Sequence, residues 1–223
     1  EEILNKFDGA IYAAWCSEML VDLLTIKWVD TANTPEDTIK ASEDLEIWAN
    51  KLQKMKVWKH PEAEQIREAV PRLLAGIGWK KGMAYRDSGK NYVEGKDNGD
   101  PEGFSKCAEQ FIQVYNDFED HDRADTLLWN AAECSQAAYK VGQAIQIRKI
   151  LLANYPESQH ATDTLHYLAG SYQAVAYYKE AAERYEEFAE KYKKDQRAPD
   201  ALQNAYLFRL GLGDEEKAKA NIE

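Results

Sequence analysis

Histidine and acidic side chains are the residues of this chain that could support catalytic or metal chemistry. None of the four histidines lies in an HExxH motif or pairs with a cysteine at zinc spacing: His60, His121, His160 and His166. No GxSxG, Walker or GxGxxG motif occurs. The densest polar cluster, 120–122, falls between expected helices, where a solvated turn is the better interpretation than a metal site. The sequence therefore predicts no catalytic residue, no metal and no cofactor, and an enzyme of unrecognised type is the alternative.

The cysteines offer little further chemistry. They are odd in number and lack CxxC spacing: Cys16, Cys107 and Cys134. Each falls where a helix would place a small apolar side chain. We expect buried thiols rather than a disulfide or a metal site.

Composition limits the classes of partner. The chain has 223 residues, of which 44% are apolar, enough for a core in one elongated domain or two smaller ones. No run approaches the roughly 18 consecutive apolar residues of a membrane helix. The net charge of -11 argues against nucleic acid, because phosphate binding needs a basic face. Solubility and a basic partner both explain the acidic balance, and both stay open.

The N-terminal third has helical spacing. Apolar residues at steps of three or four predict a long amphipathic helix over 3–29. Thr34 followed by Pro35 and Asp37 predicts the start of a second helix. We expect these helices to pack as an antiparallel hairpin, with the local tryptophans in its core rather than on a docking surface: Trp15, Trp28, Trp48 and Trp58.

The next segments are also expected to be helical. A helix is predicted from His60 to about Glu94, with a kink or break near Pro71 because proline has no amide hydrogen. The clearest loop is the Gly- and Asp-rich stretch 95–103. Helices are expected over 104–115, 125–138, 143–153, 162–173, 178–192, 200–210 and from 214 onward. No segment alternates with period two for long enough to predict a strand, so the chain is expected to be all α.

The C-terminal half recurs with a period of 37 residues. Four sets of positions share this register: Phe118, Tyr155 and Tyr192; Ala124, Ala161 and Ala198; Leu128, Leu165 and Leu202; Ala144, Ala181 and Ala218. A period in the 30s with helical spacing predicts a stack of helix pairs.

One copy has a recognisable pattern of small and large residues: Leu165, Leu168, Ala169, Tyr172, Tyr178, Ala181, Tyr185 and Phe188. Small residues let two helix axes approach, and aromatic residues fill the space around them. The pattern resembles the tetratricopeptide repeat (TPR) family, which implies antiparallel helix pairs stacked into a right-handed superhelix. The period of 37, rather than about 34, and Tyr206 at an expected small position depart from that family.

The longer period and the linker around Tyr155-Pro156 look like those of bacterial periplasmic and outer-membrane-associated TPR proteins. This likeness implies a scaffold in the bacterial cell envelope, with the cytoplasm as the alternative location. We predict an N-terminal helical region over 1–75 and repeats over 76–223, in copies at 76–121, 122–158, 159–195 and 196–223. The last copy is incomplete, which is expected to leave an apolar edge available for contact.

In the resembling family, ligands lie on the concave surface formed by the first helix of each pair. Matching positions here imply six partner-binding residues: Trp129, Glu133, Gln136, His166, Gln173 and Gln203. Trp129 is the sharpest of them, because a wide aromatic ring beside Gln and Glu suits an extended peptide. Its packing on the neighbouring helix pair is the alternative.

The family's clamp for a C-terminal carboxylate uses Lys, Arg and Asn. The corresponding positions here hold Trp129, Glu133 and Asn130, then His166, so this clamp is not expected. An acidic groove favours a basic or neutral segment instead. The sequence thus predicts a non-enzymatic scaffold that binds a peptide or protein partner. The alternative is a structural subunit that stacks through its open repeat ends.

Overall fold

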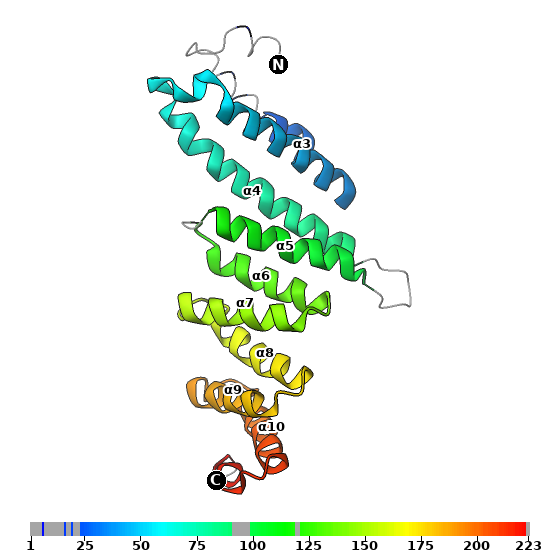
Figure 1. Cartoon of the computed structure of the whole chain (residues 1–223), viewed down its shortest axis with the longest axis vertical. Coiled ribbons are helices and arrows are strands. Elements are labelled where there is room, and N and C mark those ends of the chain that lie inside the picture. Colours follow the sequence, from blue (N-terminus) through cyan, green and yellow to red (C-terminus); the bar gives the residue numbers. More distant parts are fainter. Residues whose placement is uncertain are drawn as a thin grey trace. The chain divides into compact units, whose positions relative to one another are not determined.

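The computed structural model describes Lys6, Cys16, Met19 and then residues 23–90, 99–118 and 121–221. The chain divides into two compact units, Glu1–Asp122 and Arg123–Glu223. Every regular element in the described ranges is a helix, and no strand occurs in them (Figure 1). The predicted all-α fold is confirmed. The predicted N-terminal region 1–75 and the four copy boundaries stay predictions.

The described part of the first unit is built on two long helices and a third that packs beside them. A π-helix, Thr25–Val29, and α3, Pro35–Lys54, come first. Two short 3₁₀ turns, Lys56–Lys59 and Pro61–Ala63, lead into α4, Glu64–Gly89, and α5 follows at Pro101–Asp117. α4 packs against both α3 and α5.

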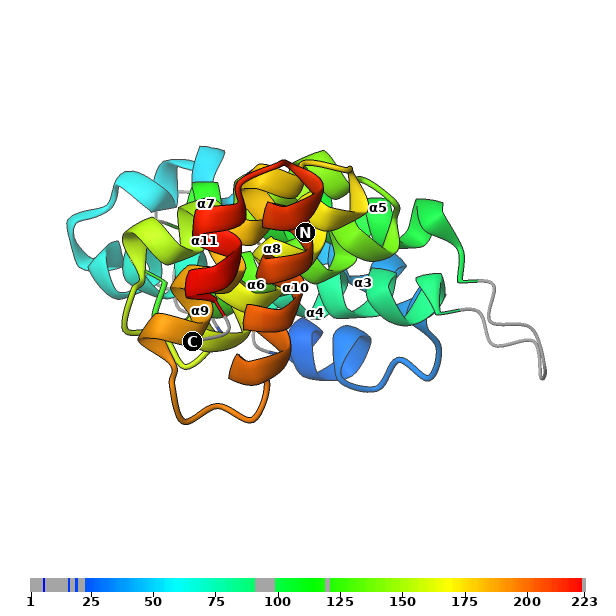
Figure 2. The ribbon, with the colours of Figure 1, turned by 90° about the horizontal axis from the view of Figure 1, so that it is seen from below.

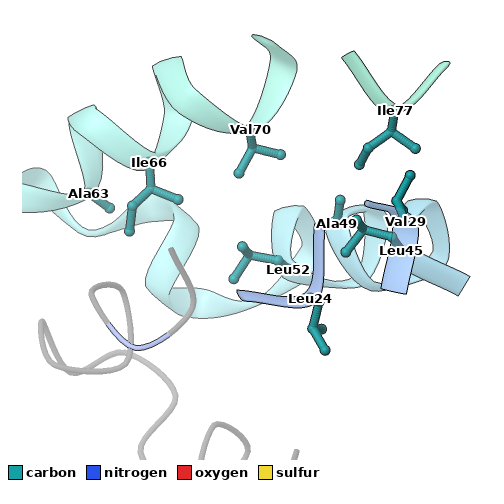
Figure 3. Packing of buried hydrophobic residues seen from close by; sticks show 9 residues of the cluster. All are labelled: Leu24, Val29, Leu45, Ala49, Leu52, Ala63, Ile66, Val70 and Ile77. Atoms are coloured by element: carbon teal, nitrogen blue, oxygen red, sulfur yellow. The ribbon is translucent and has the colours of Figure 1, made fainter. Parts of the chain in front are cut away.

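The core of the first unit lies between α3 and α4. Leu45 and Leu52 of α3 face Val70 and Ile77 of α4, and all four are buried (Figure 3). Three of the tryptophans expected in this core are partly buried and pack against it: Trp28, Trp48 and Trp58. Trp15 and most of the predicted helix 3–29 lie outside the described residues.

The start of α3 follows the sequence, but the course of α4 does not. Thr34 caps α3, because its Oγ1 accepts a hydrogen bond from the Asp37 amide at 3.1 Å. α4 runs continuously through Pro71, so the expected break is absent. Proline removes one amide donor, whereas Val70 before it and Ile77 after it are buried against α3 and hold both parts of the helix in place.

The predicted loop 95–103 is wrong at its C-terminal end, where α5 already begins at Pro101. The Asp100 side chain accepts hydrogen bonds from the amides of Glu102 at 3.0 Å and Gly103 at 3.2 Å, and so caps the helix. Gly103 also allows α5 to approach α4. A Cβ at Gly103 would lie 2.7 Å from the Gly89 Cα. α4 ends at Gly89 rather than near Glu94.

Residues 123–221 of the second unit form a run of six helices, each packed against the next. They are α6 (Ala124–Ala137), α7 (Val141–Asn154), α8 (Ala161–Ala174), α9 (Tyr178–Lys191), α10 (Ala198–Gly211) and α11 (Glu215–Ala220). Figure 2 shows the ribbon from below, with α10 and α11 in front. The predicted bounds of α6 to α10 are confirmed to within two residues.

The expectation of buried thiols is wrong at all three cysteines. Cys107 and Cys134 are buried as expected, but each takes part in a disulfide bond. Cys16 is a free thiol and is exposed. A disulfide needs cysteine Cα atoms within about 7 Å of one another, a condition that the tertiary fold sets and that spacing along the chain does not reveal.

The turn inside each helix pair repeats the same backbone geometry. Tyr139, Ala176 and Gly213 stand 37 residues apart and have positive φ values of 59°, 59° and 78°. After Ala176, the Tyr177 amide donates to the Tyr172 carbonyl at 2.9 Å, which closes the helix end. Side chains with a Cβ disfavour this left-handed conformation, so two of the three turns carry local strain.

Replacing Ala176 with glycine is expected to stabilise the second unit by about 0.5–1 kcal/mol, because glycine removes the Cβ strain at little packing cost. Urea unfolding of the wild-type and Ala176→Gly proteins measures the difference. Gly213→Ala is the matched control and should destabilise by about 1 kcal/mol. Equal stability of all three proteins would show that the turns carry no strain.

Candidate functional site

The residues predicted for partner binding lie on α6, α8 and α10, the first helices of their pairs. The structure brings five of them into two clusters, one around Arg148 and one around Tyr185, and leaves Gln203 apart from both. Gln203 is exposed on α10, beside Leu207, which is 53% exposed. Whether these residues bind a partner stays a prediction.

The first cluster centres on Arg148 of α7, whose side chain is only 2% exposed. Its Nη2 donates to Glu133 Oε1 at 2.8 Å, and its Nη1 donates to Gln136 Oε1 at 3.0 Å. Ser171 of α8 also donates to Gln136 Oε1, at 3.1 Å. A buried cation is therefore neutralised by a carboxylate that reaches the surface, and the same cation fixes the orientation of a glutamine.

Arg148 was not among the residues predicted from the sequence, although its position along the helix indicates burial. Arg148 lies four residues after Ala144 and three before Leu151, and both of those side chains are fully buried. Helical spacing thus places it on the inner face of its helix. A charged residue at such a position is buried only when it is paired, which points to a partner on a neighbouring helix.

Trp129 packs on the neighbouring helix pair. Its ring stacks on His160 with centroids 5.0 Å apart and on Tyr167 with centroids 5.8 Å apart. The Arg148 guanidinium lies over the Tyr167 ring at 5.8 Å from its centroid. These contacts support the structural alternative for Trp129 and leave only part of its ring for a partner.

The second cluster joins α8 to α9. The His166 ring makes edge contacts with Tyr185 and Phe188, at centroid distances of 5.8 and 5.0 Å. Its Nδ1 is buried and has no hydrogen-bond partner among the described residues. Burial lowers the pKa of His166 below its ordinary value, and the positive charge of Arg197 lowers it further. The Tyr185 hydroxyl donates to Gln173 Oε1 at 2.9 Å.

Acidification should destabilise the protein in part through His166. The pKa of His166 in the folded protein is below its ordinary value, so the unfolded chain binds the proton more readily. The stability associated with neutral His166 is therefore present at neutral pH and is lost as the pH falls below about 6.5. Between pH 7.5 and 5.5 we expect a larger fall in Tm for the wild type than for His166→Gln, measured by circular dichroism. An equal fall in Tm for His166→Gln would show that His166 does not contribute to the loss of stability.

The two clusters are equivalent in the repeat. Gln136 and Gln173 are 37 residues apart, as are the donors to them, Arg148 and Tyr185. In both copies, a side chain of the second helix donates a hydrogen bond to the Oε1 atom of a glutamine on the first helix. Arginine can only donate, which fixes the identity of that oxygen in the first copy. Within the described ranges, neither Nε2 group donates a hydrogen bond. Both Nε2 groups can therefore donate to a bound partner.

Two classes of site are not found in the described part of the chain. No group of three or more His, Cys, Asp or Glu residues is placed there to hold a metal ion. None of its helices combines the length and the apolar character that crossing a membrane would require.

Comparison with known proteins identifies the fold. No family model and no curated protein matches the sequence. Two crystal structures of a kinesin light chain-like protein from Podosopora anserina, with nearly identical TPR-like repeats, are similar to this chain. The sequence identities are 14% and 15%, and each match covers 92% of this chain and 90% of the other with a TM-score of 0.51. The TPR-like fold is confirmed, and the likeness to bacterial periplasmic proteins stays a prediction.

Proposed function

We propose that this protein is a non-enzymatic scaffold that binds an extended segment of a partner protein along α6, α8 and α10. Stacked helix pairs present long surfaces of this kind, and TPR-like repeats commonly mediate contacts between proteins. The observation that carries the proposal is the pair of oriented glutamines, Gln136 and Gln173, one on each of two successive first helices.

The oriented amides suit a peptide main chain. With Oε1 occupied, each Nε2 can donate to a main-chain carbonyl, and binding costs little side-chain entropy because the rotamer is already fixed. Glu133 adds a negative charge beside Gln136, and its side chain is 41% exposed. One of its oxygens is bonded to Arg148 and the other is available as an acceptor. This arrangement favours a basic or neutral segment.

The proposed setting is the assembly of a bacterial cell envelope. It rests on the period of 37 residues and on the linker around Pro156, which look like those of periplasmic repeat proteins. The alternative role, a structural subunit that stacks through its repeat ends, predicts self-association or a larger complex. Sedimentation of the purified chain separates the two roles, because a stable monomer contradicts self-stacking.

Selection from a peptide-display library tests the binding proposal. We expect enriched peptides to carry Lys or Arg, and Gln136→Glu and Gln173→Glu each to weaken their binding about 3- to 10-fold, the effect of one lost hydrogen bond. Glutamate keeps the oxygen that Arg148 or Tyr185 needs, removes the amide donors and adds a negative charge, whose own effect is measured by a charge-matched control. Gln146→Glu, on the exposed side of α7, is the charge-matched control and should bind normally. Unchanged affinity in both variants would refute the proposal.

A further inference from the structure

An open cavity of about 170 Å³ lies in the first unit, where α4 passes between α3 and α5 (Figure 1). Its polar lining consists of three amides and two carboxylates: Asn50, Gln110, Gln113, Glu46 and Asp117. We propose that this cavity binds the side chain of an arginine on a partner protein. The cavity shares no residue with the glutamines of the second unit, so this proposal is tested independently of the proposed function.

Gln110 is a buried polar residue that faces the cavity without a partner. It is only 7% exposed, and it forms no hydrogen bond with any described residue. A buried amide without a hydrogen bond is costly and needs an explanation. One period later the equivalent position holds Ile147, which is 4% exposed, so the fold accepts an apolar side chain there and does not require an amide. A polar ligand in the cavity would supply the missing bond.

Gly78 of α4 allows this amide to pack closely. A Cβ at Gly78 would lie 2.4 Å from Val114 Cγ2 and 3.3 Å from Gln110 Nε2. α5 therefore packs directly on the backbone of α4, and the Gln110 amide lies against the same backbone. Because close packing already restricts the side chain, a ligand that bonds to it loses little further conformational entropy.

Charge around the cavity favours a cation. Glu46 is paired with Lys81, whose Nζ lies 2.9 Å from Oε2, and the Oε1 atom has no bond to a described residue. Asp117 has no ion pair in the described ranges, and it ends α5, where the helix dipole adds negative partial charge. Arg72 lines a neighbouring hollow with two further acidic residues, so it brings no excess positive charge. One negative charge is left over, and a bound cation would neutralise it.

Arginine suits this arrangement better than lysine. The acceptors stand on two different walls, α3 and α5, and a planar guanidinium has five donors that can reach both. Phe118 is the aromatic residue of the lining, and a guanidinium stacks well on an aromatic ring. The methylene groups of the arginine would pack on Leu74 and Val114, which supply the apolar part of the wall.

The first probe is n-propylguanidinium, the arginine side chain by itself, added to the ¹⁵N-labelled full chain. We expect saturable NMR shifts of the Gln110 and Gln113 side-chain amides, with a dissociation constant of about 1–10 mM for a ligand of this size. Neutral n-propylurea and n-butylammonium, the lysine side chain, should each bind at least about 5-fold more weakly. No shift with n-propylguanidinium at about 50 mM, or equal binding of either analogue, would overturn the proposal.

The second probe tests whether the arginine can belong to a protein. The capped peptide acetyl-Gly-Arg-Gly-amide should shift the same amide signals and bind at least as tightly as n-propylguanidinium, because its backbone stays outside the cavity. If n-propylguanidinium binds and the peptide does not, the cavity takes a free small molecule, and the proposal of a partner protein is wrong.

Variants of the protein locate the site, with the Gln113 amide as the signal. Gln110→Ile removes the buried amide and should abolish the shifts. Asp117→Asn keeps the shape of an exposed side chain and should weaken binding about 3- to 10-fold through the lost charge. Asp44→Asn makes the same change on an exposed part of α3 outside the cavity and should bind like the wild type. If Gln110→Ile and Asp117→Asn bind as tightly as Asp44→Asn, the ligand occupies another surface and the proposal fails.

Discussion

Glu133→Ala is expected to lower the free energy of unfolding of the second unit by about 2 kcal/mol. The substitution leaves Arg148, which is 2% exposed, without its carboxylate. Removing one partner of a fully buried ion pair costs about 3–5 kcal/mol, and the smaller value here allows for the 41% exposure of Glu133, which brings water to one end of the pair.

Arg148→Met should cost less, about 1 kcal/mol, although it removes the buried member of the pair. Methionine fills a similar space without a charge, Glu133 becomes hydrated, and Gln136 keeps its hydrogen bond from Ser171. In the double variant, the loss of Glu133 should add almost nothing to the loss of Arg148. Urea unfolding of the four proteins gives the coupling energy directly.

The exposed pair formed by Arg184 and Glu187 is the control for this cycle. Their side chains are 38% and 45% exposed and three residues apart on α9. Glu187→Ala should cost less than about 0.5 kcal/mol. If Glu133→Ala costs no more than that, the Arg148 cluster does not stabilise the fold.

Much of the second unit could be predicted from the sequence because its signals are local. Apolar spacing and the recurring small residues Ala144 and Ala181 set the helix bounds and the register of the repeat. Position along a helix does not reveal which neighbour a side chain contacts. For Trp129 the sequence left both partner binding and packing on the next pair open, and in the structure its ring stacks on His160 and Tyr167 of that pair. The partners of Arg148 also come from two neighbouring helices, because it donates to Glu133 of α6 and to Ser171 of α8.

In the first unit, neighbouring residues favoured different local structures. Asp100-Pro101 has the same form as Thr34-Pro35, a capping side chain followed by proline, and both start helices in the structure. The glycines around Asp100 indicated a loop and concealed that start. At Pro71 the local rule favoured a break, and the buried neighbours of the proline kept the helix continuous.

Phe188→Ala is expected to have the largest effect on stability, a loss of about 3–5 kcal/mol. The ring is fully buried, contacts the rings of His166 and Tyr192, and lies beneath the Arg197 guanidinium at 5.3 Å. Because helices in a stack depend mainly on their neighbours, amides of α9 and α10 should lose protection from hydrogen exchange more than those of α6. Phe188→Leu keeps most of the volume and should cost less than half as much.

A second measurement separates a local cavity at Phe188 from general unfolding. Burial is the largest cause of the low pKa of His166, so water entering the space left by Phe188 should raise that pKa toward its ordinary value. NMR titration of the folded Phe188→Ala protein reports the shift. Phe208→Ala, at a partly buried position on α10, is the matched control and should leave His166 closer to its wild-type behaviour. An unchanged His166 pKa in Phe188→Ala would mean that the space closes without admitting water. If Phe188→Ala loses no more stability than Phe208→Ala, the Phe188 cluster is not the main support of α9.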